Sequence, residues 1–185
     1  MALFVLPLFL VVVALAVVAL YNGLVLLRNQ VRNAWQQIGV QLKRRHDLIP
    51  NLVEVVKDYM GYEQETLEKV IRARNQAIQA TGVQGTAAAE GALTGALRSL
   101  FAVVEAYPQL KANENMLAIQ EELTSTENRI AFARQGYNDS VMEYNIRRET
   151  FPANLIANVF AFTQAEQLQS TESPEERKTP RVSFS

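Results

Sequence analysis

The sequence contains no cysteine and a single histidine, His46. A chain without cysteine forms no disulfide framework, no thiolate metal site and no cysteine nucleophile. A di-iron helical bundle needs a Glu-x-x-His motif on two helices, and one histidine cannot supply both. The sequence also lacks a Gly-x-Ser-x-Gly nucleophile motif and a glycine-rich loop ending in Gly-Lys-Ser/Thr. We therefore expect a protein that is not an enzyme and that holds no cofactor and no metal.

Charged side chains are absent from the chain before Arg28. Residues 2–20 are apolar apart from Pro7, and at about 1.5 Å per residue they span about 28 Å, close to the hydrocarbon thickness of a bilayer. This pattern predicts a transmembrane anchor in residues 1–23. A cleaved signal peptide is the alternative, because Ala14-Leu15-Ala16 resembles a cleavage site. No basic segment precedes the apolar run, however, and the run continues past that site, which favours a retained anchor.

Positive charge is concentrated directly after the anchor. Residues 28–60 carry six basic and three acidic side chains, a local charge of +3. By the positive-inside rule this bias places the C-terminal domain in the cytoplasm, and a periplasmic domain is the alternative. We expect the lipid bilayer to be a partner of this segment, and no nucleic acid, because no aromatic side chains alternate with the cations. The membrane-proximal basic residues are Arg28, Arg32, Lys43, Arg44 and Arg45.

Apolar side chains recur at helical spacing after the anchor, and no stretch alternates with a period of two. We expect helices at about residues 24–60, 62–80, 87–107, 112–150 and 153–162, with a loop at 81–86. Pro50 either kinks the first helix or breaks it near Leu48, and the unbroken apolar register favours a kinked, continuous helix. Residues 163–185 are polar, contain proline and show no periodicity, which predicts a disordered tail.

The lengths of these helices and their short connections predict an all-α fold. The expected architecture is an N-terminal transmembrane helix (1–23) that continues into an antiparallel up-and-down four-helix bundle (24–162). The first and last helices of this bundle are long, and the last carries an apolar seam of about 30 residues at the three-and-four spacing of a coiled coil.

Several polar residues fall on or beside the predicted apolar seams. They either pair in buried networks that fix the register of the helices or lie at the rim of the core. These candidate structural polar residues are Arg45, Glu63, Arg74, Thr126 and Asn128.

Two other sets of polar residues have a plainer interpretation. His46 lies in a run of charged residues, where we expect it to be solvated or paired with Asp47. Three acidic residues close to one another in the last long helix could bind a hard cation, although helix carboxylates more often form a solvated face. These acids are Glu121, Glu122 and Glu127.

Several strings of this sequence resemble the LemA family of bacterial membrane proteins over about residues 21–162. The strings are YNGLV (21–25), LRNQV (27–31), AW (34–35), VQLKRR (40–45), DLIPNLVE (47–54), YPQLKAN (107–113), TENRIA (126–131) and YN (144–145). The resemblance implies a single membrane anchor followed by a helical bundle, with no established enzymatic activity. Two features depart from the family pattern: Gly39 stands where we expect Asp, and Arg147-Arg148 is more basic than usual.

We hypothesise that the protein is a membrane-anchored, non-catalytic scaffold of the bacterial inner membrane that forms homo-oligomers and organises the cell envelope. The alternative is a signalling or adaptor module that docks a soluble partner or a membrane protease through its basic stripe or its tail. A hydrolase that uses carboxylates is a third and weaker reading, because the chain offers few catalytic groups.

Overall fold

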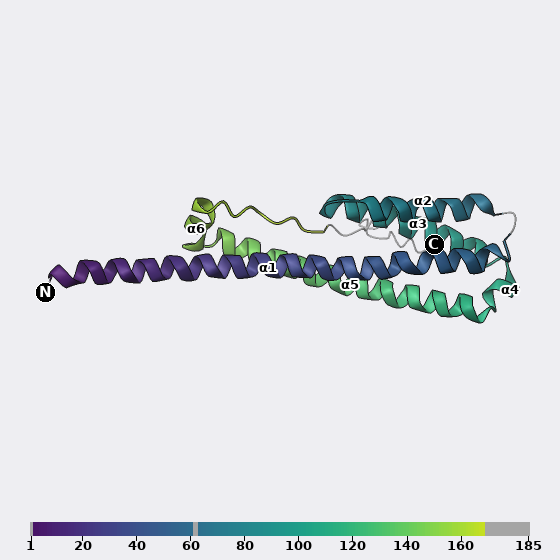
Figure 1. Cartoon of the computed structure of the whole chain (residues 1–185), viewed down its shortest axis with the longest axis horizontal. Coiled ribbons are helices and arrows are strands. Elements are labelled where there is room, and N and C mark those ends of the chain that lie inside the picture. Colours follow the sequence, from purple (N-terminus) through teal and green to yellow (C-terminus); the bar gives the residue numbers. More distant parts are fainter. Residues whose placement is uncertain (1, 61–62, 169–185) are drawn as a thin grey trace, which may run out of the picture. The chain divides into compact units, whose positions relative to one another are not determined.

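The computed structural model describes residues 2–60 and 63–168, with side chains from Val5 onward, and its regular secondary structure is helical (Figure 1). No strand occurs in these two ranges, so the predicted all-α class is confirmed. The helices are α1 (Ala2–Lys57), α2 (Gln64–Gln79), α3 (Val83–Val104), α4 (Pro108–Lys111), α5 (Glu114–Glu149) and α6 (Ala153–Val159).

Helix α1 runs without interruption for 56 residues and passes through Pro50. The predicted continuity is therefore confirmed, and the alternative of a break near Leu48 is wrong. The helix ends at Lys57, three residues before the predicted end, where the amide of Met60 donates a hydrogen bond of 3.0 Å to the carbonyl of Val56. The apolar seam on both sides of Pro50 explains the continuity, because burial of that seam offsets the lost backbone hydrogen bond.

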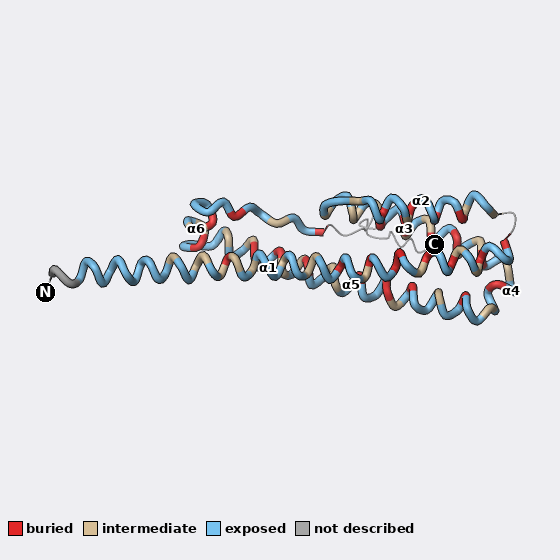
Figure 2. The backbone as a smooth tube through the Cα atoms, in the orientation of Figure 1, coloured by how far each residue is buried: buried red, intermediate tan, exposed pale blue. Residues whose placement is uncertain are grey.

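The N-terminal part of α1 is exposed along its length (Figure 2). Leu6, Leu8 and Leu15 are each 65% exposed, although a leucine in water would favour burial. By length and composition this segment can cross a bilayer, and so can α3. The leucines of α3 are buried within the protein, as in a soluble core helix, whereas residues 5–16 of α1 are all exposed in the described part of the chain. The N-terminal helix therefore suggests a membrane anchor.

The described chain divides into two compact units, and each is considered by itself. Unit 1 contains residues 2–48 and 118–167, and unit 2 contains residues 49–60, 63–117 and Leu168. Helices α1 and α5 each contribute to both units. A single antiparallel bundle of four helices stays a prediction.

In unit 1 the helices α1 and α5 run in opposite directions. Leu24 of α1 shares a buried cluster with Tyr144, and further along α1 the ring of Trp35 lies 5.3 Å from that of Tyr137. As the residue numbers increase along α1, the numbers of the contacting residues in α5 decrease. The two helices are therefore antiparallel. The long seam predicted for the last helix is the face of α5 that makes these contacts.

In unit 2 the helix α2 packs on α3. Both helices begin and end close to the predicted positions, except that α3 begins at Val83, four residues earlier than predicted. Gly82 has a φ of +74°, which a glycine adopts without a steric cost, and it ends the turn before α3. Pro108 then begins the short helix α4, a position that needs no backbone N–H.

Candidate functional site

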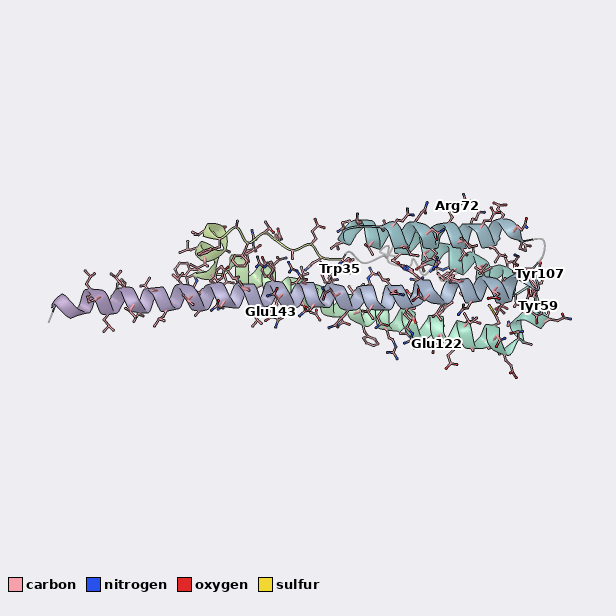
Figure 3. The ribbon with its side chains drawn as sticks, in the orientation of Figure 1. Trp35, Tyr59, Arg72, Tyr107, Glu122 and Glu143 are labelled. Atoms are coloured by element: carbon pink, nitrogen blue, oxygen red, sulfur yellow. The ribbon has the colours of Figure 1, made fainter. Side chains whose placement is uncertain are left out.

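The functional candidates on which the structure bears most directly lie in unit 1, along the paired helices α1 and α5. Ion pairs join the two helices at one end of this pairing. The Arg44 guanidinium lies 2.6 Å from the Glu122 carboxylate, and the Arg45 guanidinium lies 3.1 Å from the Glu127 carboxylate. Figure 3 labels Trp35 on α1 and Glu122 and Glu143 on α5 as guides to this pairing.

Three of the five membrane-proximal basic residues pair with acidic side chains. Lys43 pairs with Asp47 on the next turn of α1, while Arg44 and Arg45 pair with carboxylates of α5. These side chains are therefore engaged within the chain, which weakens their attraction for an acidic partner. Nearer the anchor, the Arg28 guanidinium lies 5.0 Å from the centre of the Phe162 ring, a cation–π contact. Arg32 is exposed.

Of the five candidate polar residues, two are buried in unit 1. Arg45 is 4% exposed and pairs with the half-exposed Glu127, whereas Thr126 is fully buried. The Thr126 hydroxyl has no hydrogen-bond partner among the described residues. Asn128 is exposed and takes no part in this core.

The remaining two candidate polar residues, Glu63 and Arg74, belong to unit 2 and are half-buried. Arg74 donates a hydrogen bond of 3.3 Å to the side chain of its neighbour Asn75. The five residues are therefore distributed over both units, and whether they form one network stays a prediction.

His46 is buried, at 7% exposure, so the expectation of a solvated side chain is wrong, whereas the alternative of a pairing with Asp47 stays a prediction. His46 lies between Leu42 and Ile49 at spacings of four and three, which places it on the buried face of α1 beside Arg45. The charged neighbours of His46 suggested an exposed side chain. The helical spacing of His46 from Leu42 and Ile49 indicated burial, and it was the better guide. In the described part of the chain no group of three His, Asp or Glu side chains could hold a metal ion, and this includes Glu121, Glu122 and Glu127.

A groove runs along the outer surface of the α1–α5 pair. It consists of two adjoining depressions of about 440 and 420 Å³ that share Gln37, Phe132 and Ala133. Phe132 is 75% exposed at its edge. The further lining residues are Gln30, Asn33, Ala34, Val40 and Gln41 from α1, and Arg129, Gly136, Ser140 and Glu143 from α5. We call this feature the α1–α5 groove.

Residues 160–167, which we call the return segment, follow α6 and lie along α5. Asn145 holds Ala165 through two hydrogen bonds, one from its amide group and one to its carbonyl oxygen, of 2.9 and 3.0 Å. The Arg148 guanidinium donates to the carbonyl of Phe162 at 2.8 Å. Thr163–Gln167 were predicted to begin a disordered tail, and these contacts correct that prediction. Residues 169–185 of the predicted tail lie outside the described residues.

Two tyrosine hydroxyls complete this attachment. Tyr137 donates to the carbonyl of Glu166 at 2.7 Å, and Tyr144 donates to the carbonyl of Thr163 at 2.8 Å. Burial raises the pKa of Tyr137, and the Glu166 carboxylate adds to this rise. Burial also raises the pKa of Tyr144, against the opposing effect of Arg148 and Arg28. Both phenols therefore stay protonated and donate hydrogen bonds throughout the physiological pH range.

The sequence did not predict that four side chains of α5 together hold the return segment. These side chains are Tyr137, Tyr144, Asn145 and Arg148. Tyr144-Asn145 stood out as one string of the resemblance, but nothing in the spacing of the chain indicated a backbone segment as its partner. The basic pair Arg147-Arg148 was noted only as a departure, and Arg148 proves to hold the carbonyl of Phe162.

Together these features define a class: a helical protein with an apolar N-terminal helix suited to a membrane, continuous with paired helices that carry a surface groove. The model of the LemA family matches residues 34–184. The chain therefore belongs to the LemA family, as the sequence motifs predicted.

The chain is also similar to individual proteins that bear this family's name or another. It is 28% identical to Protein LemA of Metamycoplasma hominis, over 74% of this chain and 63% of that protein. It is 25% identical to Magnetosome protein MamQ 2 of Paramagnetospirillum magneticum, over 80% of this chain and 64% of that protein. The chain thus spans less than two thirds of the length of these relatives, whose names describe no enzymatic activity.

Replacement of Thr126 by valine tests whether its buried hydroxyl is unpartnered. We expect Thr126→Val to raise the free energy of unfolding by about 1 kcal/mol, because valine keeps the shape and removes a buried polar atom. Thr124→Val is the matched control, since Thr124 is exposed and donates to the carbonyl of Gln120. Denaturant unfolding of the full chain in detergent, followed by circular dichroism, measures both. A loss of stability at Thr126 would show that the hydroxyl has a partner.

Replacement of Glu127 by glutamine tests the ion pair of the buried Arg45. Glu127→Gln should cost about 1–2 kcal/mol, because it leaves a buried guanidinium without its carboxylate, while the half-exposed position of Glu127 limits the loss. Glu122→Gln, which removes the partner of the half-exposed Arg44, should cost less than about 0.5 kcal/mol. Equal losses in the same unfolding measurement would contradict a structural role for Arg45.

Proposed function

We propose that the protein is a membrane-anchored, non-catalytic LemA-family protein that self-associates through the α1–α5 groove and so organises the bacterial cell envelope. The observation that carries this proposal is the groove itself: its α1 side belongs to the helix that begins with the apolar segment, and its α5 side exposes the ring of Phe132. We further propose that the anchor lies in the inner membrane, with the following domain on the cytoplasmic side.

The composition of the groove favours a protein partner. Phe132 and Val40 are 75% and 65% exposed, and together they add a large apolar contribution to an otherwise polar surface. Gly136, which also lines the groove, has open space where a Cβ atom would stand. The packing of the chain itself therefore does not require glycine there, and a small residue allows another helix to approach closely.

A buried polar atom in the groove also lacks a partner. The side-chain oxygen Oε1 of Gln41 is shielded from solvent and accepts no hydrogen bond from the described residues. Buried polar atoms in proteins are generally paired, so a donor beyond the described residues would complete this site, and a second copy is our candidate for its source. Glutamine and asparagine donors line the same groove, and a second copy would bring them to it.

The membrane restricts how two copies can meet. Two anchors in one bilayer enter it in the same direction, so a two-fold axis along the membrane normal relates the copies. Residues at the same level of α5 then face each other across the axis, Phe132 against Phe132 and Gly136 against Gly136. The two α1–α5 pairs would form a layer of four helices, a stable arrangement for helices with apolar stripes.

Disulfide cross-linking tests this arrangement directly, because the natural chain contains no cysteine. We expect Phe132→Cys to form a covalent dimer in membranes under mild oxidation. Gln135→Cys is the matched control, because Gln135 is exposed at nearly the same level of α5 but does not line the groove. The measurement is the dimer fraction on non-reducing gels, and we expect it to be several-fold higher at position 132.

Light scattering of the natural chain in detergent provides the second arm. A protein mass of two or more times 20.7 kDa supports self-association, and a strictly monomeric particle would contradict it. Equal cross-linking at positions 132 and 135, with a confirmed oligomer, would assign the contact to another surface.

The contacts of the basic stripe do not favour the adaptor alternative. Lys43, Arg44 and Arg45 are each within 3.1 Å of a carboxylate of the same chain. An acidic partner would therefore have to displace existing ion pairs before it could bind.

A reporter fused to the C-terminus tests the orientation. Arg28 and Arg32 follow the apolar segment closely and no basic residue precedes it, so we expect the C-terminal side to remain in the cytoplasm. A fused alkaline phosphatase should be inactive in cells and a fused green fluorescent protein should be fluorescent. The reverse pair of signals would place the domain in the periplasm.

A further inference from the structure

Helix α6 exposes an apolar face and buries a small-residue face. Leu155 and Val159 are 55% and 76% exposed and four residues apart, so they share one side of α6. Phe151, which precedes the helix, is 74% exposed. Ala153 and Ala157, also four residues apart, are 2% and 1% exposed on the side toward the protein. This is the reverse of a surface helix in water, which turns its polar face outward.

The segment around α6 is also free of charge. Residues 151–165 contain no Asp, Glu, Lys, Arg or His. Exposed connections in water are commonly rich in polar and charged side chains, whereas most exposed positions of this segment are apolar. We call Phe151, Leu155, Val159 and Phe160, which is 51% exposed, the α6 apolar patch.

Helix α6 and the residues after it pack against α1 close to the end of the apolar run, which indicates what covers the α6 apolar patch. Ala157 and Phe162 pack in one cluster with Leu24 of α1. The ring of Tyr21 lies 4.9 Å from that of Phe160 and 5.7 Å from that of Phe162, edge to face. Leu24 is four residues beyond Leu20, where the apolar run of α1 ends, a distance of about 6 Å along the helix axis. The polar headgroup layer on each side of a bilayer is about as thick.

Cations and an aromatic hydroxyl surround the patch as at a membrane interface. Arg28 lies against the Phe162 ring, and Arg147 is exposed in the last turn of α5. Basic side chains at this level can reach lipid phosphates while their stems cover apolar surface. Tyrosine is typical of the same level, and Tyr21 occupies it.

We propose that the α6 apolar patch lies in the headgroup interface of the bilayer that α1 crosses, with anionic phospholipid as its partner. The inference rests on the proposed membrane anchor. The patch adjoins the anchor through the Tyr21 and Leu24 contacts, and this continuity favours lipid over a second copy or another protein.

A second point of contact with the membrane changes what the anchor can do. A single helix leaves the attached domain free to rotate about the helix axis and to tilt. A contact on one side of that helix restricts both motions, because packing and interfacial anchors set the tilt of a membrane helix. Unit 1 then presents the α1–α5 groove in a defined direction along the membrane surface.

Spin labels test this proposal in the full chain, reconstituted in vesicles of phosphatidylethanolamine and phosphatidylglycerol. Single cysteines at Leu155 or Val159 carry a nitroxide, and its collision rates with oxygen and with a water-soluble nickel chelate are compared. Oxygen concentrates in the bilayer and the chelate in water. We expect oxygen collisions to predominate at both positions, and circular dichroism verifies that each variant is folded.

Two controls separate this inference from the anchor itself. Gln135→Cys, at an exposed residue of α5 that does not line the α1–α5 groove, should report water. Val12→Cys, within the apolar run, should report the bilayer. If the Val12 label lies in lipid and the Leu155 and Val159 labels lie in water, the anchor stands and the interfacial role of α6 is overturned. If all of them lie in water, the proposed anchor fails as well.

The same labels distinguish lipid from protein as the partner. A second copy seated on the patch would bring two labels together and broaden the spectrum, an effect that dilution with unlabelled protein removes. Shielding of the label from both oxygen and the chelate would indicate a protein cover. Either result would overturn the proposal.

Discussion

The continuity of α1 as a single helix is the constraint on which the rest of unit 1 depends. The helix begins in the charge-free segment and continues past Pro50 to Lys57. Each residue of a helix is rotated by about 100° from the one before, so the membrane segment and the residues that meet α5 share one fixed helical phase. A flexible linker after the anchor would remove this relation.

The pairing with α5 and the return segment builds on that constraint. Tyr144, Asn145 and Arg148 hold backbone groups of the return segment, and this attachment places Phe162 against Leu24. Because these hydrogen bonds join side chains to backbone atoms, they require no apolar periodicity in the segment that they hold. The tail was predicted to begin at Thr163 because the sequence from there is polar and has no periodicity. Hydrogen bonds to backbone atoms leave no trace in either property, so the prediction was wrong there.

Much of the local structure follows from short-range signals in the chain. The seam from Leu27 to Val56 predicts a helix through Pro50, and the heptad-like seam predicts α5 to within about two residues. The predicted start of α3 is too late because Gly82 and Gly85 both resemble loop residues, whereas Gly85 lies within the helix. The burial of His46 follows from spacing as well, although its charged neighbours argued against it.

The sequence by itself determined the helical class, the apolar start, the membership of the LemA family and the shortage of catalytic groups, because these depend on composition, period and local strings. Only the tertiary structure decided the partners: Arg45 with Glu127, the two tyrosines with the return segment, and α6 beside Tyr21. These contacts join residues far apart in the chain. The free energy of each contact depends on the distance between the two groups and on how far they are buried. Both are set only once α1 and α5 have packed together.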